Sequence, residues 1–141
     1  MAQFARETIK IPSDLGPQDR KQLAEEIIDF IIENAKSGVG ARKHGESFRY
    51  YPLSSKPYTE EYAKKKGVSR TSVDLTYDDE MLNAMEVIST KKGEVTIGYK
   101  QGNDQNGKAE GNIIGSYGKS PNKKKARPFI GITQKDLLEL L

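Results

Sequence analysis

Two groups of residues in this chain are of types that can do chemistry, and each also has a simpler structural explanation. The adjacent acids Asp78, Asp79 and Glu80 could hold Mg²⁺ and serve a metal-dependent nuclease. They also stand where a short helix is predicted to begin, and acidic side chains stabilise that end of a helix. His44 is the single histidine, and its place in a glycine-rich stretch favours a solvated side chain over a catalytic one.

Two further stretches contain part of a known motif. Gly118–Ser120 ends like a phosphate-binding loop, but Ile113 stands where that motif requires its first glycine. A calcium loop aligned on Gly107 would again place Ile113 where a bidentate glutamate belongs. The absence of cysteine excludes disulfides, and a single histidine excludes the common zinc sites. The sequence therefore predicts no catalytic residue, metal or cofactor, and we expect a protein that is not an enzyme.

Positive charge is concentrated near the C-terminal end. Residues 105–128 include six basic residues and one acidic residue, which gives this segment +5, whereas the whole chain carries +3. Such a cluster can contact DNA or an acidic partner, although a solvated loop beside a strand is the simpler explanation. No base-reading or stacking motif accompanies it, so sequence-specific recognition is not expected. The candidate contacts are Lys123, Lys124, Lys125 and Arg127.

The composition suits one small soluble domain that spans 1–141. The hydrophobic set makes up 35% of the residues and charged residues 30%, which predicts a modest core and a highly charged surface. No stretch approaches the roughly 20 apolar residues of a membrane helix. The N-terminus lacks an apolar run of signal-peptide length, so a cytoplasmic protein is expected.

Hydrophobic periodicity and turn residues predict the order of the elements. Together they indicate an α+β domain, in which a small, mostly antiparallel sheet carries one long helix packed on it. Short helices are expected after Thr59 and near Thr76, and at most one helical turn near 108–114. The main expected elements are a strand at 4–11, a long helix at 17–36, a long loop at 38–58, a β-hairpin at 86–100, and a strand followed by a helix at 127–141.

Two features point to contacts between subunits. The apolar residues of helix 17–36 spread over roughly 200° of its circumference, which is wider than one sheet requires. Either this helix is deeply buried in its own domain, or one flank meets another subunit. The loop 38–58 is long for a small domain, and such loops are usually functional or mobile. The candidate subunit contacts are Phe30, Ile32, Phe48, Tyr50 and Tyr51.

Several stretches, in this order and spacing, resemble the neck and tail-completion proteins of tailed bacteriophages, a virion-morphogenesis group. Residues 23–67 ("LAEEIIDF" to "YTEEYAKKKG") resemble the family's first helix and its tyrosine-containing stretch. "VDLTYDDEMLNAMEVIS" resembles the stretch before the family's hairpin, although Asp79-Glu80 stand where the family usually has a glycine. "VTIGY", "KAEGNIIGSYG" and "ARPFIGIT" resemble the return strand, the short helix and the closing strand. The likeness covers about 17–141.

The resemblance implies a structural protein of the virion, assembled in the host cytoplasm and away from any membrane. Copies would form a six- or twelve-fold ring between the portal-adaptor complex and the tail tube or tail terminator, with packaged DNA in the lumen. Lys123–Lys125 and Arg127 would then face that DNA or an acidic neighbour. The atypical "NKKKA" stretch leaves neck, tail completion and tail terminator open. A nonspecific nucleic-acid-binding accessory protein and a metal-dependent nuclease are the alternatives.

Overall fold

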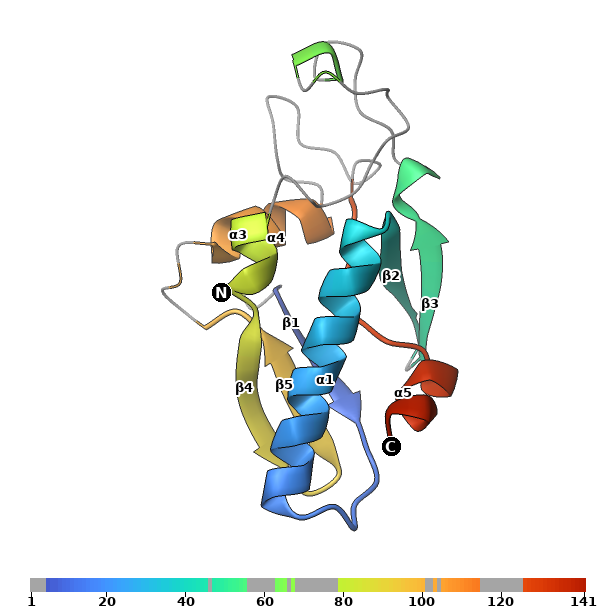
Figure 1. Cartoon of the computed structure of the whole chain (residues 1–141), viewed down its shortest axis with the longest axis vertical. Helices are drawn as coiled ribbons and strands as arrows, with labels where there is room; N and C mark the ends of the chain where they lie inside the picture. Colours follow the sequence, from blue (N-terminus) through green and yellow to red (C-terminus); the bar gives the residue numbers. More distant parts are fainter. Residues whose placement is uncertain are drawn as a thin grey trace.

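In the computed structural model of the chain, a long helix lies across a small antiparallel sheet, and a separate two-stranded sheet stands beside that helix (Figure 1). The structure describes residues 5–45, 47–55, 63–65, 67, 79–100, 103, 105–114 and 126–141. The architecture is α+β, as the order of the sequence patterns predicts.

The larger sheet is antiparallel throughout and has the strand order β1-β5-β4. Alternation of β-branched residues explains its central strand, because Val95 and Ile97 face the core while Thr96 points to the opposite face. There the Thr96 hydroxyl lies 2.8 Å from the hydroxyl of Thr8 on the neighbouring strand. The strands are β1 (Arg6–Lys10), β4 (Glu86–Lys91) and β5 (Glu94–Gly98).

The hairpin β4–β5 closes through a glycine turn. Gly93 has a φ of 85°, a conformation that a residue with a Cβ rarely adopts. A register shift inserts Ile88 as an extra residue in β4, which bends this edge strand. The predicted strand at 4–11 and the predicted hairpin at 86–100 are therefore confirmed, with ends that differ by a few residues.

Helix α1 (Pro17–Lys36) has the bounds that the sequence predicts. Pro17 begins the helix, where a missing N–H removes no helical hydrogen bond, and Asp19 lies near the positive end of the dipole. Beyond Lys36, the Gly38 N–H donates to the Ala35 carbonyl, and the φ of 85° at Gly38 suits a helix C-terminus. The helix contacts β4, β5 and β2. Its buried residues are Leu23, Ala24, Ile27, Ile28, Ile31 and Ala35.

The stretch 38–58, predicted as a loop, forms a hairpin over its described part, so that prediction was wrong. β2 (Val39–His44) pairs antiparallel with β3 (Ser47–Pro52), and a short 3-10 helix follows at Leu53–Ser55. β3 contains Phe48, Tyr50 and Tyr51, which favour strands, but β2 contains glycine, alanine and lysine, which are depleted in strands, so only one half of the hairpin has a clear sequence pattern. Residues 56–58 lie outside the described residues.

The C-terminal segment 127–132, predicted as a strand, is buried but belongs to no strand ladder among the described residues. One backbone hydrogen bond, from the Ala41 N–H to the Pro128 carbonyl at 3.2 Å, joins it to β2. Apolar burial therefore takes the place of strand pairing in holding this segment. The buried apolar side chains are those of Phe129, Ile130 and Ile132.

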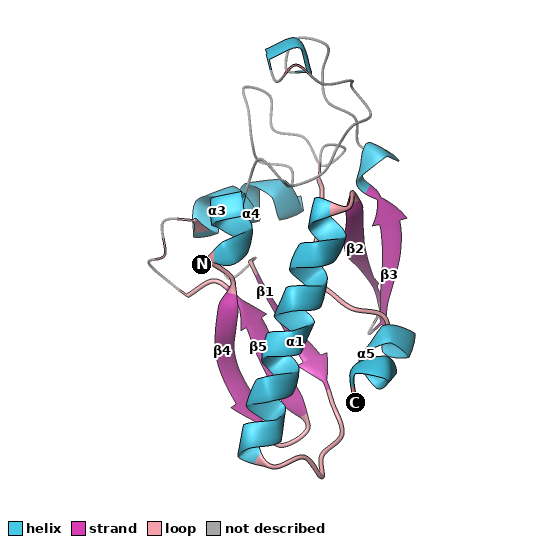
Figure 2. Cartoon of the chain, in the orientation of Figure 1, coloured by secondary structure: helices cyan, strands magenta, loops and turns pink. Residues whose placement is uncertain are grey.

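Helix α5 (Gln134–Leu140) ends the chain as predicted. The Thr133 side chain accepts a hydrogen bond from the Asp136 N–H at 3.2 Å, which satisfies one of the helix's unpaired donors. Leu137 is buried on the inner side of this helix. In Figure 2, α5 lies beside the closed end of hairpin β2–β3.

Two more helices lie at one end of the larger sheet (Figure 1). α3 (Asp79–Asn83) and α4 (Asn106–Ile114) contact each other, and α4 is longer than the single turn predicted near 108–114. Residues 63–65 are helical, within the short helix predicted after Thr59. The Tyr99 hydroxyl donates to the Met81 carbonyl at 2.6 Å, which ties α3 to the end of β5.

The buried apolar side chains of the described residues form one cluster, drawn from α1, both sheets and the C-terminal segment. Full burial of a large apolar side chain contributes about 1.5–3 kcal/mol, so this cluster is the main source of stability. Among the described residues, no helix has both the length and the apolar character needed to cross a bilayer.

Candidate functional site

The residues of chemical interest do not assemble into a metal site within the described part of the chain. No three histidine, aspartate or glutamate side chains there come together in a group that could hold a metal ion. Asp79 and Glu80 begin α3, as the helix-capping explanation expects, while Asp78 lies outside the described residues. His44 ends β2 and is exposed.

The predicted basic cluster divides between two environments. Lys123, Lys124 and Lys125 lie outside the described residues. Arg127 is only 7% exposed, so it is not the solvent-facing contact that the sequence suggests. The chain already enters the core at this point, because buried Phe129 follows two residues later.

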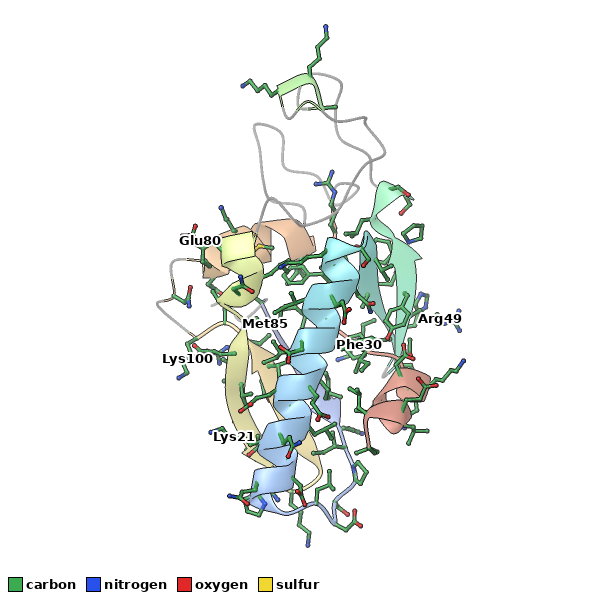
Figure 3. All side chains as sticks on the ribbon, in the orientation of Figure 1. Lys21, Phe30, Arg49, Glu80, Met85 and Lys100 are labelled. Atoms are coloured by element: carbon green, nitrogen blue, oxygen red, sulfur yellow. The ribbon has the colours of Figure 1, made fainter. Side chains whose placement is uncertain are left out.

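The aromatic candidates for a subunit interface instead pack within the chain. Phe30 and Ile32 are half-buried against the core cluster. The Phe30 ring lies 6.4 Å from the Tyr50 ring, centroid to centroid, in a tilted arrangement, and Figure 3 shows Phe30 between α1 and the hairpin. This flank of α1 therefore meets hairpin β2–β3, which accounts for the wide apolar face of the helix.

Phe48 and Tyr51 are buried, and each occupies space left by a glycine. A Cβ on Gly131 would lie 2.3 Å from the Phe48 ring. A Cβ on Gly40 would lie 2.7 Å from both the Tyr51 ring and the Pro128 carbonyl oxygen. The Tyr51 hydroxyl donates to that carbonyl at 2.8 Å. These close approaches fix the hairpin on the C-terminal segment.

Tyr50 joins the hairpin to α5 through a polar contact. Its hydroxyl donates to Asp136 Oδ2 at 2.6 Å and accepts from the Thr133 N–H at 3.3 Å. Burial raises the pKa of Tyr50, and the hydrogen bond to the Asp136 carboxylate raises that pKa further, because both favour the neutral phenol. The three groups form a latch between β3 and the start of α5, called here the Tyr50 latch.

The face of the hairpin away from Tyr50 carries positive charge toward the turn, whereas Gly40 and Tyr51 of the same face are buried. Residues paired directly in the ladder share a face, and Arg42 pairs with Arg49 while His44 pairs with Ser47. All four are exposed, and we call them the hairpin outer face. The Arg42 guanidinium carbon lies 4.1 Å from the centre of the Tyr51 ring. In Figure 3, Arg49 lies on the side of the hairpin away from α1.

Sequence reasoning missed Arg42 and Arg49 because the stretch was assigned to a loop, where residue pairing has no meaning. A usable signal is present in "ARKHGESFRY". Gly45 directly follows His44, the last paired residue of β2, and has a φ of 64°, as tight hairpin turns require. Counting outward from the pair His44 and Ser47 pairs the two arginines.

Comparison of the chain with protein-family models, with curated protein sequences and with solved structures finds no match.

Proposed function

We propose that this protein is a structural subunit of a tailed-bacteriophage particle, a neck or tail-completion protein whose copies form a ring at the head–tail interface. The ring joins the portal-adaptor complex to the tail, and packaged DNA passes through its lumen. One observation carries the proposal: the order and spacing of the family-like stretches over 17–141. A tail terminator is the nearest alternative position for the same kind of ring.

The described surface offers a contact that copies of the chain could share. A closed ring uses a heterologous interface, in which one face of a subunit meets a different face of the next. Leu138 on α5 and Leu141 at its C-cap are 57% and 50% exposed, and they are the exposed large apolar side chains of the described residues. Because the aromatic candidates pack within the chain, these two leucines are the candidate contact between copies.

The test is a count of copies in purified particles that carry this gene, made by quantitative mass spectrometry against the major capsid protein. We expect a small fixed number that matches one ring. Absence of the protein from finished particles would contradict the proposal. Cryo-electron microscopy of the same particles would separate a neck position from a tail-terminator position.

A double variant tests the candidate contact between copies. Leu138→Asp with Leu141→Asp places charge on the exposed side of α5, so we expect a folded chain that is not incorporated into particles. The matched control is Glu139→Gln, an exposed position on the same helix, which should be incorporated normally. Normal incorporation of the leucine variant would remove α5 from the interface.

The second candidate is a nonspecific nucleic-acid-binding accessory protein, which the exposed arginines of the hairpin outer face favour. Such a protein would bind duplex DNA as a single chain, with an affinity that falls steeply with salt, and would be absent from particles. A single ring subunit would bind far more weakly, because its few cations act together only after assembly.

A further inference from the structure

The hairpin outer face holds two like charges directly opposite each other. The ladder pairs Arg42 with Arg49, and directly paired residues of antiparallel strands have Cα atoms about 4.5–5.5 Å apart. Both side chains are exposed. Like charges in this arrangement destabilise a hairpin, so the pair works against the fold that contains it.

No carboxylate of the described residues offsets this repulsion. Two described acids near the hairpin are engaged elsewhere, since Glu7 forms an ion pair with Lys43 at 3.5 Å and Asp136 accepts from Tyr50. Neither Arg42 nor Arg49 takes part in an ion pair with a described residue. Two guanidinium groups therefore stand in solvent on one narrow ribbon, without a described anion.

One of these guanidinium groups is held in place before any ligand arrives. Arg42 stacks on the Tyr51 ring, with 4.1 Å from its guanidinium carbon to the ring centre. Tyr51 is itself fixed, because its hydroxyl reaches across Gly40 to the Pro128 carbonyl. A stacked arginine loses less side-chain freedom on binding than a freely rotating one.

We infer that the hairpin outer face binds the phosphate backbone of duplex DNA. Guanidinium groups present planar pairs of N–H donors that match phosphate oxygens. A two-stranded ribbon has the dimensions to lie in or along a groove of B-form DNA. The inference rests on the proposed function for the source of the DNA. It goes further than that function by naming the surface that meets DNA in the lumen.

An acidic protein surface fits this face less well. Protein partners are held mainly by apolar and aromatic anchors in desolvated pockets. The exposed large apolar side chains of the described residues, Leu138 and Leu141, lie on α5 and at its C-cap rather than on the hairpin outer face. Phosphate contacts need no apolar anchor, carry no sequence preference and let DNA slide, which suits DNA that moves through a channel.

The test is a salt titration of DNA binding by the full chain. Fluorescence anisotropy of a short labelled duplex gives the association constant at salt concentrations from about 50 to 200 mM, where phosphate contacts weaken steeply. Each phosphate contact contributes about 0.9 to the slope of log K against log salt. Arg42→Gln with Arg49→Gln should therefore lower the slope by about 1.8 and weaken binding at low salt.

Two matched variants separate this surface from net charge. Arg42→Lys with Arg49→Lys keeps both charges and should retain most of the slope. Lys91→Gln with Lys92→Gln removes the same charge at the turn between β4 and β5, where both lysines are exposed, and should leave the slope unchanged. Loss of the arginine pair removes a repulsion but also the stacking of Arg42 on Tyr51. A thermal midpoint of the variant close to that of the wild type shows that unfolding does not explain lost binding.

Three results would overturn the inference. Unchanged binding by the arginine-to-glutamine variant would place the contact elsewhere, for example at Lys123–Lys125. Equal losses in that variant and in the Lys91/Lys92 control would show an effect of net charge alone. Binding of labelled polyglutamate as tight as that of DNA would favour an acidic protein instead. The particle count is independent of all three, so the proposed function can fail while this inference stands.

Discussion

Hairpin β4–β5 shares a ladder with β1 and packs beneath α1. Hairpin β2–β3 forms a sheet of its own, and it packs against α1, the C-terminal segment and α5. The first hairpin places Val95 and Ile97 fully inside the core. The second is held by two glycine contacts and by the Tyr50 latch. Both hairpins reach the core cluster, the second through Phe48 and Tyr51, but the second shares no ladder with the larger sheet and is otherwise joined to the fold by these few specific contacts.

This difference leads us to expect two levels of stability in one chain. A strand whose side chains form the core opens only when the whole domain unfolds, while an element joined by a few contacts can open on its own. Hairpin β2–β3 should therefore exchange its amide protons sooner than hairpin β4–β5. The hairpin that carries the outer-face arginines is then the part of the described chain that can adjust to a ligand.

The largest expected effect is at the centre of the larger sheet. Ile97→Ala removes a fully buried side chain, and such truncations lower the free energy of unfolding by about 2–5 kcal/mol. Urea denaturation followed by circular dichroism measures this loss. The matched control is Ile88→Ala, at the half-buried extra residue of β4, which should lose far less. Equal losses at both positions would contradict the account of this sheet.

A smaller, local effect is expected where the second hairpin rests on the C-terminal segment. Gly131→Ala places a Cβ 2.3 Å from the Phe48 ring, and overpacking of this kind destabilises by about 1–3 kcal/mol. Hydrogen exchange should show lost protection in β2 and β3 while β5 stays protected. Gly107→Ala is the control, because its Cβ would meet nothing within 4 Å. Uniform loss of protection in both sheets would rule out independent opening.

The Tyr50 latch should contribute less to the free energy of unfolding than the apolar packing does. Tyr50→Phe removes a hydrogen bond to a carboxylate, which is worth about 1.5 kcal/mol when the groups are partly buried. Asp136→Asn keeps an acceptor oxygen, so it should lose less stability than Tyr50→Phe. Chemical denaturation at neutral pH checks both values. A loss in Asp136→Asn that exceeds the loss in Tyr50→Phe would show that the carboxylate serves another role.

The same latch predicts a dependence on alkaline pH. The pKa of Tyr50 is raised in the folded protein above its ordinary value of 10.0, so the folded state prefers the neutral phenol. Its contribution is complete below that ordinary value and is lost as pH rises through the folded pKa. The stability difference between the wild type and Tyr50→Phe should therefore shrink above about pH 10. A constant difference would show that the phenol does not titrate with folding.

The smallest effect concerns the ion pair between Lys43 and Glu7, which links β2 to β1 at 3.5 Å. Burial raises the pKa of Glu7 above its ordinary value of 4.5, and attraction to Lys43 offsets only part of this rise. Ionised Glu7 thus opposes folding slightly, and Glu7→Gln should change stability at neutral pH by no more than about 1 kcal/mol, without a net loss.

Acid pH checks the sign of this last prediction. As pH falls through the folded pKa of Glu7 toward 4.5, the wild type becomes protonated and gains stability relative to Glu7→Gln. Urea denaturation across that range measures the difference. A wild type that loses stability relative to the variant on acidification would mean that the ion pair supports folding after all.

Much of the larger sheet could be predicted because its signals are local. The turn at Gly93, the alternation around Ile97 and the periodicity from Pro17 to Lys36 each lie within one stretch of chain. Hairpin β2–β3 could not be predicted in the same way. Its first strand has little β propensity, and its packing depends on Gly131, more than seventy residues away in the sequence.

The sequence alone determined the α+β class, the bounds of α1, the hairpin β4–β5 and the Thr133 cap, because these depend on propensity and on neighbours a few residues apart. Only the tertiary structure decided which aromatic residues are buried and that Arg127 is buried. Burial is set by contacts between distant segments, and no local pattern reports those contacts.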